Sequence, residues 1–157
     1  MDTNDAYRLA TKLLREHDLT HWRFKFDNAK SRFGLCDPNK RVISLSRHLT
    51  ELNPEAEVRE TILHEIAHAL TPGKGHGPEW KRVARSIGSN AGRTHDAAVP
   101  EARWLLICPS CANTTKRSRR TKTGAVTACG KCCREHNKGV WHKDYVYVWV
   151  ANPAFVG

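Results

Sequence analysis

The sequence predicts an α+β fold in two parts: helices with a small antiparallel sheet over residues 1–100, and a small cysteine-rich β domain over residues 101–157. Three observations support this prediction. Apolar residues recur at helical spacing near the N-terminus and again over 55–70, alternating strand patterns lie between these helices, and the last third holds two pairs of closely spaced cysteines. A chain of 157 residues can bury one core and carry a smaller second unit.

The first part is expected to begin with an amphipathic helix over about 3–17, where apolar positions recur every three or four residues. Alternating apolar and polar residues over 22–26 and 42–46 predict strands with one buried face, and the run 32–36 predicts a third strand. The turn residues at 37–40 are expected to join the last two strands in a hairpin.

Two further helices are expected after these strands. Asn53 is expected to cap the first of them, with Pro54 at its first helical position, and Pro72 and Gly73 are expected to end it. Pro78 is expected to open the second helix. The first of these two helices carries the most informative pattern in the chain.

That pattern is HEIAH, over residues 64–68. His64 and His68 lie about one turn apart on one face of a helix, so both imidazoles can reach one Zn²⁺. They fall nearly opposite the apolar face of the helix, as residues lining a cleft do, whereas core histidines would lie within that face. Glu65 then lies beside the metal, where it can take a proton from a bound water. We interpret the pattern as a catalytic zinc site; surface or structural histidines are the alternative.

A catalytic zinc has three protein ligands and one open position. His76 follows the helix after a Thr-Pro-Gly-Lys-Gly break that reverses the chain, and it is the candidate third ligand. A loop histidine without a ligand role is the alternative. Trp80 is expected to pack the next helix beneath the metal site. These residues favour a zinc hydrolase that acts on peptides; an amidase with other substrates is a further reading.

Cysteines form the second constellation. Cys108 and Cys111 are followed, after 17 residues, by Cys129 and Cys132. Two such pairs at this spacing are typical of a structural four-cysteine zinc site, so two zinc ions are expected in all. A redox motif would need one pair on a thioredoxin-like unit, and disulfides would suit a secreted chain, for which no signal peptide is visible. Cys133 remains a competing ligand.

The net charge of +10 is uneven, with +3 on the first 100 residues and +7 on the rest. The densest basic run is expected on an exposed loop between the cysteine pairs and consists of Lys116, Arg117, Arg119, Arg120 and Lys122. Such side chains on a rigid ribbon suit phosphates and predict DNA binding without sequence preference; a solvated charge run is the alternative. No apolar run is long enough to predict a membrane-spanning helix.

Taken in order, LSRHL at 45–49, HEIAH at 64–68, HGPEW at 76–80 and the cysteine ribbon resemble the SprT-like family, which includes the Spartan proteases. The resemblance covers about residues 5–150. It implies a zincin-like zinc metalloprotease domain in the first part of the chain and a nucleic-acid-binding zinc ribbon in the second.

The resemblance further implies His64, His68 and His76 as ligands of the catalytic zinc, Glu65 as general base, and DNA-dependent proteolysis of proteins bound or crosslinked to DNA, as in DNA repair. We expect a monomer in the cytoplasm of a prokaryotic or phage-infected cell, or in the nucleus of a eukaryotic one. The main alternative is a non-catalytic zinc- and DNA-binding protein whose histidine site is structural. The intact Glu65 argues against that alternative, because a structural site does not need this carboxylate.

Overall fold

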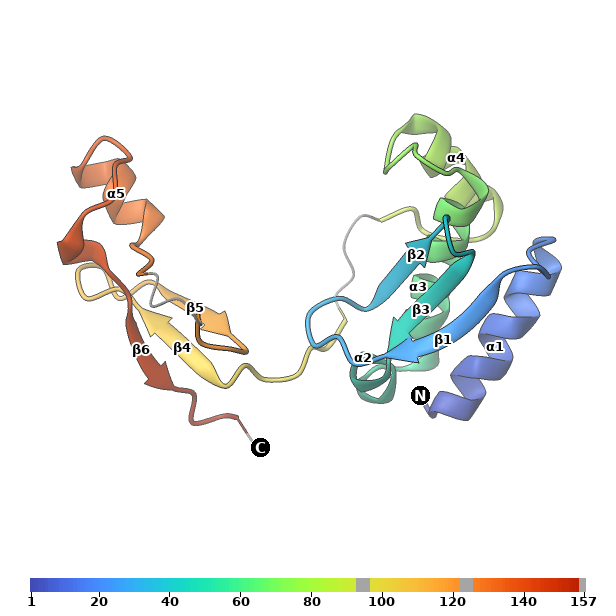
Figure 1. Ribbon diagram of the computed structural model, residues 1–157, viewed down its shortest axis with the longest axis horizontal. Coiled ribbons are helices and arrows are strands. Elements are labelled where there is room, and N and C mark those ends of the chain that lie inside the picture. The colour runs from blue at the N-terminus through green and yellow to red at the C-terminus, as the bar shows by residue number, and fades with distance from the viewer. Residues whose placement is uncertain (93–96, 122–125, 156–157) are drawn as a thin grey trace. The chain divides into compact units, whose positions relative to one another are not determined.

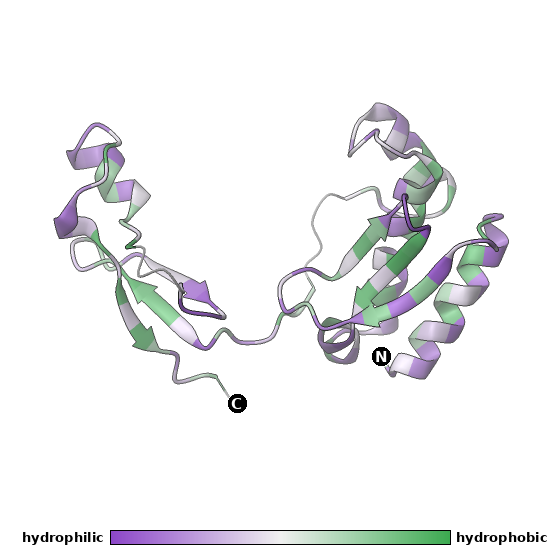
Figure 2. Cartoon of the chain, viewed as in Figure 1, coloured by the Kyte–Doolittle hydropathy of each residue, from purple (hydrophilic) through white to green (hydrophobic). Residues whose placement is uncertain are grey.

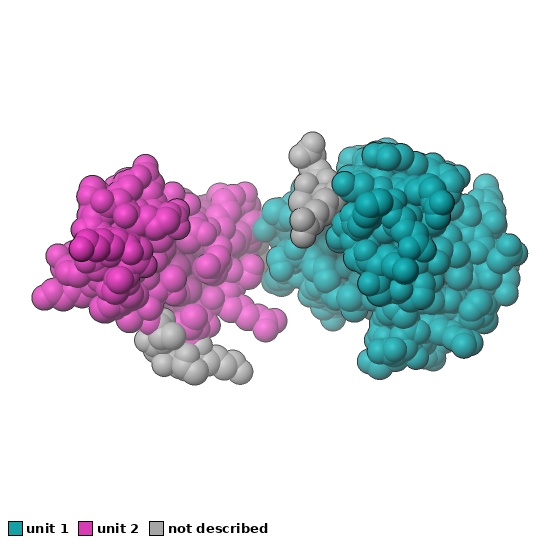
Figure 3. Space-filling view, turned by 90° about the horizontal axis from the view of Figure 1, so that it is seen from above, with its two compact units in different colours: residues 1–100 teal, residues 101–157 magenta. Residues whose placement is uncertain are grey.

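The computed structural model describes residues 1–92, 97–121 and 126–155. The chain divides into two compact units, residues 1–100 (unit 1) and residues 101–157 (unit 2) (Figures 1 and 3). Both units combine helices and strands, so the predicted α+β class is confirmed. Within the described part of the chain, no helix is long and apolar enough to cross a membrane.

Unit 1 begins with α1 (Thr3–Glu16), close to the helix predicted over 3–17. The side chain of Asp2 caps α1 by accepting hydrogen bonds from the backbone N–H groups of Asn4 and Asp5. The buried residues of α1 recur at helical spacing and pack into the core: Ala6, Ala10, Leu13 and Leu14. Figure 2 shows the resulting alternation of hydrophobic and hydrophilic bands along α1.

Three strands form one sheet in unit 1, in the order β1-β3-β2 (Figure 1). They are β1 (Arg23–Asp27), β2 (Gly34–Asp37) and β3 (Val42–Ser46). β2 and β3 form the predicted hairpin, but β1 pairs parallel to β3, so the prediction of an antiparallel sheet is wrong. β3 is buried along its whole length. It is the central strand of the sheet, and a central strand has neighbours on both sides that shield it from solvent.

The prediction that β3 has one buried face is also wrong. Ile43 and Leu45 face the hydrophobic core. On the other face, the Ser44 hydroxyl donates to Asp27 Oδ2 (2.8 Å) and the Ser46 hydroxyl donates to the backbone oxygen of Ala29 (2.6 Å). The last residue of β1 and the segment that follows it therefore cover part of this second face, which is a tertiary effect that alternation along one strand does not reveal.

Three helices follow the sheet: α2 (Arg47–Leu52), α3 (Glu55–Leu70) and α4 (Pro78–Ser86). α2 was not predicted, although Ser46 provides a start signal by accepting a hydrogen bond from the backbone N–H of Leu49. α3 ends just before the predicted Pro-Gly break, and α4 opens on its proline as predicted.

Asn53 does not cap α3, so that prediction is wrong. Pro54 occupies the cap position and makes no side-chain hydrogen bond. The Asn53 amide instead donates to the backbone oxygens of Leu49 (2.7 Å) and Ala98 (2.8 Å), and its Oδ1 accepts from the Ala98 N–H (2.7 Å). Because the buried Asn53 side chain already hydrogen bonds to these backbone groups, it does not cap α3.

α1 and α3 pack against the sheet and form the core of unit 1. Six of the largest fully buried side chains of this core come from β3, α2 and α3: Ile43, Leu45, Leu49, Ile62, Leu63 and Ile66. α3 is thus fixed between α1, α4 and the strands β2 and β3, and any side chain it carries toward β2 is held in place.

Unit 2 contains a second sheet with the order β5-β4-β6, in which all pairs are antiparallel. Its elements are β4 (Trp104–Ile107), β5 (Thr114–Arg117), α5 (Gly130–His136), the 3-10 helix η1 (Lys143–Tyr145) and β6 (Val148–Ala151). The strand expected over 145–150 is wrong in its bounds, because η1 occupies the start of that range. The second unit, predicted as a small β domain, also contains the helix α5, which carries Cys132 and Cys133.

Candidate metal centre and catalytic site

α3 presents His64, Glu65 and His68, and the turn before α4 brings His76 back to them. The reversal uses Gly73 and Gly75, whose φ angles of 77° and 54° lie in the left-handed region that favours glycine. The Thr71 hydroxyl donates to the backbone oxygen of Ala67 (2.6 Å) at the end of α3. Local sequence therefore sets both the end of α3 and the return of the chain.

The Nε2 atoms of the three histidines converge on one point. They are separated by 3.3 Å (His64 to His68), 3.2 Å (His68 to His76) and 3.0 Å (His64 to His76). Three nitrogens bound tetrahedrally to one Zn²⁺ at about 2.0–2.1 Å would lie about 3.3–3.4 Å apart. The donor set and its spacing therefore fit a zinc ion with three imidazole ligands.

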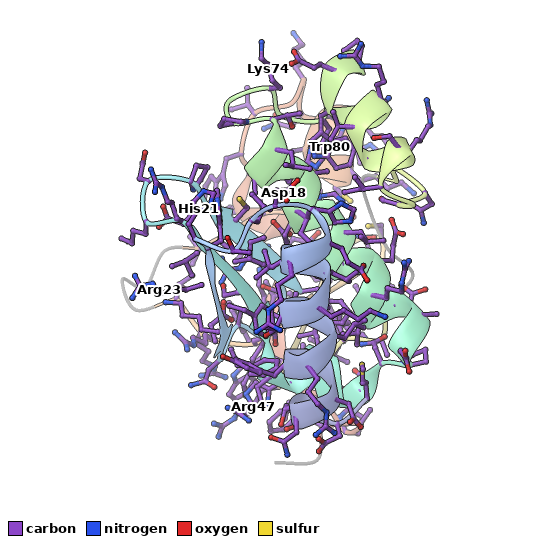
Figure 4. All side chains as sticks on the ribbon, turned by 90° about the vertical axis from the view of Figure 1, so that its right-hand side faces the viewer. Asp18, His21, Arg23, Arg47, Lys74 and Trp80 are labelled. Atoms are coloured by element: carbon purple, nitrogen blue, oxygen red, sulfur yellow. The ribbon has the colours of Figure 1, made fainter. Side chains whose placement is uncertain are left out.

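Trp80 forms the wall behind these imidazoles. Its side chain is fully buried, and its ring lies 4.8 Å from the ring of His64, 5.1 Å from His68 and 4.7 Å from His76, centroid to centroid. Figure 4 shows Trp80 at the junction of α3 and α4. The expectation that Trp80 packs beneath the site agrees with this arrangement, which holds the imidazole planes in fixed directions.

Glu65 lies beside the histidines, and its residue is only 8% exposed. Burial raises the pKa of its carboxyl to about 7, while the charge of Arg32 and the backbone N–H of Cys36 act in the opposite direction. A bound cation would also favour the carboxylate. A carboxyl group in this range can both take and release a proton near neutral pH.

A cavity of about 330 Å³ opens over this group. It is lined by residues of β2, α3 and the turn before α4, including Gly34, Leu35, His64, Glu65 and His76. Burial lowers the pKa of His68, and the charge of His76 lowers it further, so the imidazole presents a neutral nitrogen to a metal. The sequence did not predict that β2 lines this cavity, because no local sequence pattern marks the approach of β2 to α3.

The four predicted cysteines of unit 2 also come together. Cys108 Sγ lies 3.8 Å from Cys132 Sγ, and Cys111 Sγ lies 3.8 Å from Cys129 Sγ. Four thiolates bound tetrahedrally to Zn²⁺ at about 2.3 Å would lie about 3.8 Å apart. Cys133 is buried outside this group, since the turn of α5 directs its neighbour Cys132 to the other sulfurs.

The thiols of this cluster are free rather than joined as disulfides. The pKa of Cys129 is lowered to about 6, chiefly by the backbone N–H of Cys132 at the start of α5. A thiol that loses its proton near neutral pH is prepared to bind a metal, because the thiolate is the ligand form. The neighbouring sulfurs and burial raise the pKa of Cys132 to about 12, so without a metal one thiol of the cluster is acidic and another keeps its proton. The spacing of the four sulfurs is therefore the observation that fits a structural zinc site.

The predicted basic run does not form one loop. Lys116 and Arg117 lie in β5, and Lys116 forms an ion pair with Glu101 (2.9 Å). Arg119 is exposed just after β5, and the Arg120 guanidinium lies 4.1 Å from the centroid of the Trp104 ring. Lys122 lies outside the described residues.

Comparison with known proteins agrees with the order of motifs. A sequence model described as the SprT-like family matches residues 4–101. The chain belongs to the SprT-like family. Two SprT proteins are similar to this SprT-like chain: that of Pseudomonas putida is 24% identical over 69% of this chain and 74% of its own length, and that of Vibrio parahaemolyticus is 29% identical over 57% and 62%.

The germ cell nuclear acidic-1 protein of Caenorhabditis elegans is 32% identical to 48% of the SprT-like chain, which spans only 16% of that longer protein. Among solved structures, the metallopeptidase zymogen jannalysin of Methanocaldococcus jannaschii is similar to 54% of this chain over 83% of its own, with 16% identity and a TM-score of 0.48.

Replacing His76 with alanine tests the third ligand. We expect the zinc content of the purified SprT-like chain to fall from about two to about one ion per chain, since a site with two remaining imidazoles binds zinc far more weakly. Metal analysis after dialysis measures this directly. His21→Ala, which removes an exposed histidine of unit 1, should keep both ions; equal zinc content in the two variants would contradict the assignment.

Proposed function

We propose that this chain is a zinc-dependent endopeptidase that acts on proteins bound or crosslinked to DNA, and that DNA stimulates it. The observation that carries the proposal is the convergence of three imidazole nitrogens within 3.0 to 3.3 Å of one another, beside a buried glutamate in one cavity. Membership of the SprT-like family supports the same reading.

His64, His68 and His76 would hold the zinc ion. When bound, zinc supplies Lewis acidity to the scissile carbonyl and to the attacking water. Glu65 takes the proton of that water as the new C–O bond forms at the carbonyl carbon. It then delivers the proton to the amide nitrogen as the C–N bond breaks. Burial raises the pKa of Glu65 and a bound cation would lower it, and these opposing effects suit a group that first takes and then releases a proton.

β2 supports a peptide as the substrate, because it is an edge strand of its sheet and lines the cavity. A backbone hydrogen bond joins the Ser46 N–H to the oxygen of Phe33 (2.7 Å), which fixes the antiparallel register of the hairpin. In that register, both backbone groups of Gly34 and the carbonyl of Cys36 are directed to the outer edge, while the Cys36 N–H faces Glu65. An extended peptide would pair along this edge and lay its backbone across the zinc site.

Unit 2 supports DNA as the partner. One face of its sheet holds the rings of Trp104 and Trp149, 6.4 Å apart between centroids, with the Arg120 guanidinium over both. Arg117 pairs with Trp104 across β5 and β4, so its side chain emerges on the same face. Aromatic rings stack with bases, and arginines bind phosphates or stack on bases, so this face suits single-stranded DNA.

The test uses the zinc-loaded chain and a basic DNA-binding protein as substrate, with and without single-stranded DNA. We expect DNA to raise the cleavage rate at least about tenfold, because both proteins are concentrated on one polymer. Arg117→Ala/Arg120→Ala should lose most of this stimulation and show a DNA affinity less steeply dependent on salt. Lys143→Ala, which removes an exposed positive charge elsewhere on unit 2, is the matched control.

Two results would contradict the proposal in different ways. If the wild-type chain cleaves equally well with and without DNA, the DNA-dependent part fails. If it binds DNA but cleaves no substrate under any condition, the non-catalytic zinc- and DNA-binding protein becomes the better description.

A further inference from the structure

Gly34 of β2 lies against the carboxylate of Glu65. We infer that Gly34 is a positioning residue: its missing side chain leaves the space in which the Glu65 carboxylate is held for proton transfer. The inference rests on the proposed function of Glu65 as the general base. Gly34 itself touches no reacting atom and acts only through Glu65.

The space at Gly34 is already filled by Glu65. A Cβ atom added to Gly34 would lie 2.4 Å from Oε1, 2.8 Å from Cγ and 2.9 Å from Cδ of Glu65. Gly34 is not among the glycines with a positive φ angle, so its backbone is one that alanine adopts without strain. Glycine is needed here for room and not for backbone conformation.

Neither backbone can move away to make that room. Gly34 pairs with Leu45 of β3, which is fully buried, and the adjacent Ser46 to Phe33 hydrogen bond of 2.7 Å closes the end of the hairpin. α3 is fixed by its own buried residues, among which Ile66 directly follows Glu65. The Glu65 side chain is therefore the part that would rotate away.

The same strand supplies a donor that fixes the carboxylate. In the register of the hairpin, the Cys36 N–H points to the outer edge, as does that of Gly34. The Cys36 N–H faces the Glu65 carboxylate and lowers the pKa of its carboxyl. The space at Gly34 and the donor at Cys36, two residues apart, together set the direction in which Glu65 points.

Gly34→Ala is the test, with Leu52→Ala as the control elsewhere in unit 1. Leu52 is the last residue of α2, is 52% exposed and is not among the residues that line the cavity over the histidines. We expect Gly34→Ala to keep two zinc ions and a melting temperature within a few degrees of wild type, while kcat falls about 100-fold, the loss typical of a misplaced catalytic group. Leu52→Ala should keep wild-type kcat.

A double variant separates positioning from a general structural effect. If Gly34 acts through Glu65, adding Gly34→Ala to Glu65→Gln should cost no further activity, because the general base is already absent. If the activity losses of the two single variants multiply in the double variant, the inference is overturned. A Gly34→Ala variant with wild-type kcat would also overturn it.

Amide hydrogen exchange gives a reading that needs no activity. In the wild-type chain the Cys36 N–H should exchange slowly, and Gly34→Ala should accelerate it at least about tenfold as the carboxylate moves away. If the chain proves to cleave no protein, this exchange measurement still decides the position of Glu65. Unchanged exchange in Gly34→Ala would then overturn the inference independently of the proposed function.

Discussion

Glu65→Gln should reduce peptide cleavage by a factor of about 10² to 10⁴, the range for loss of a positioned general base. Glutamine has nearly the size of glutamate, so it fits the space beside Gly34, but it has no basic oxygen that can accept the proton of the attacking water. The cleavage assay with DNA and a DNA-binding substrate measures the loss. The histidine ligands are untouched, so the variant should still contain two zinc ions.

The unfolding free energy of the variant, measured with a chelator that removes zinc, shows whether Glu65→Gln loses only the proton-transfer step or also its folded structure. The pKa of Glu65 in the folded, metal-free chain is raised from 4.5 to about 7, so folded protein holds this proton more tightly than unfolded chain. The stabilisation that this bound proton gives to the folded chain is complete below the pKa of the unfolded chain and disappears as the pH rises through about 7. At pH 8 and with chelator, Glu65→Gln should therefore exceed wild type in unfolding free energy by up to about 3 kcal/mol.

The difference between the two chelated proteins should vanish near pH 4, where both carry a neutral side chain. Thermal unfolding at the two pH values measures it. A Glu65→Gln variant that cleaves substrate at the wild-type rate would remove Glu65 from the mechanism. A variant that has lost its zinc or its fold would not support the role of a base either.

The largest expected effect on folding lies in unit 2. Among its described residues, the buried apolar side chains are few, and four of the six are cysteines: Ala102, Leu106, Cys108, Cys129, Cys132 and Cys133. So small a core does not offset the chain entropy of some 50 residues, whereas a structural zinc ion contributes about 10–16 kcal/mol at neutral pH. Cys129→Ser should therefore unfold unit 2 and lower the zinc content to one ion per chain.

Unit 1 should remain folded in this variant, because its core does not depend on the cysteines. Amide NMR spectra would show the signals of unit 2 collapse to unfolded positions while those of unit 1 stay dispersed. Cys133→Ser changes a cysteine that is equally hidden but lies outside the metal-binding group, so it should keep both ions and the fold. A folded Cys129→Ser chain with two ions would contradict the assignment of the cluster.

Local signals in the sequence predicted much of the site. A four-residue repeat of histidine lies on one helix face by geometry alone, and the Pro-Gly break returns the chain toward it, so the grouping of His64, His68 and His76 followed from the sequence. The spacing of the cysteine pairs predicted their grouping in the same way. These features depend on residues close in sequence, where helix and turn geometry leave few alternatives.

The remaining features depend on distant residues. Gly34 lies against Glu65 only because β2 packs on α3, and no sequence pattern in either segment predicts this contact. The parallel pairing of β1 with β3 joins two strands that are separated in the sequence by β2, and alternation within either strand does not encode that pairing. The choice of Cys132 over Cys133 depends on the direction of α5, since adjacent residues on a helix point about 100° apart.

The indole of Trp80, packed against three imidazoles inside an apolar core, has a thermodynamic consequence. This packing restricts the rotation of the three rings, so uptake of zinc by unit 1 should cost little conformational entropy and need little rearrangement. Unit 2, which we expect to unfold without zinc, would instead have to order its chain as it takes up its ion. Zinc depletion would therefore leave unit 1 folded but inactive and unit 2 unfolded. When zinc is supplied again, unit 1 would need only to bind its ion, whereas unit 2 would also have to refold.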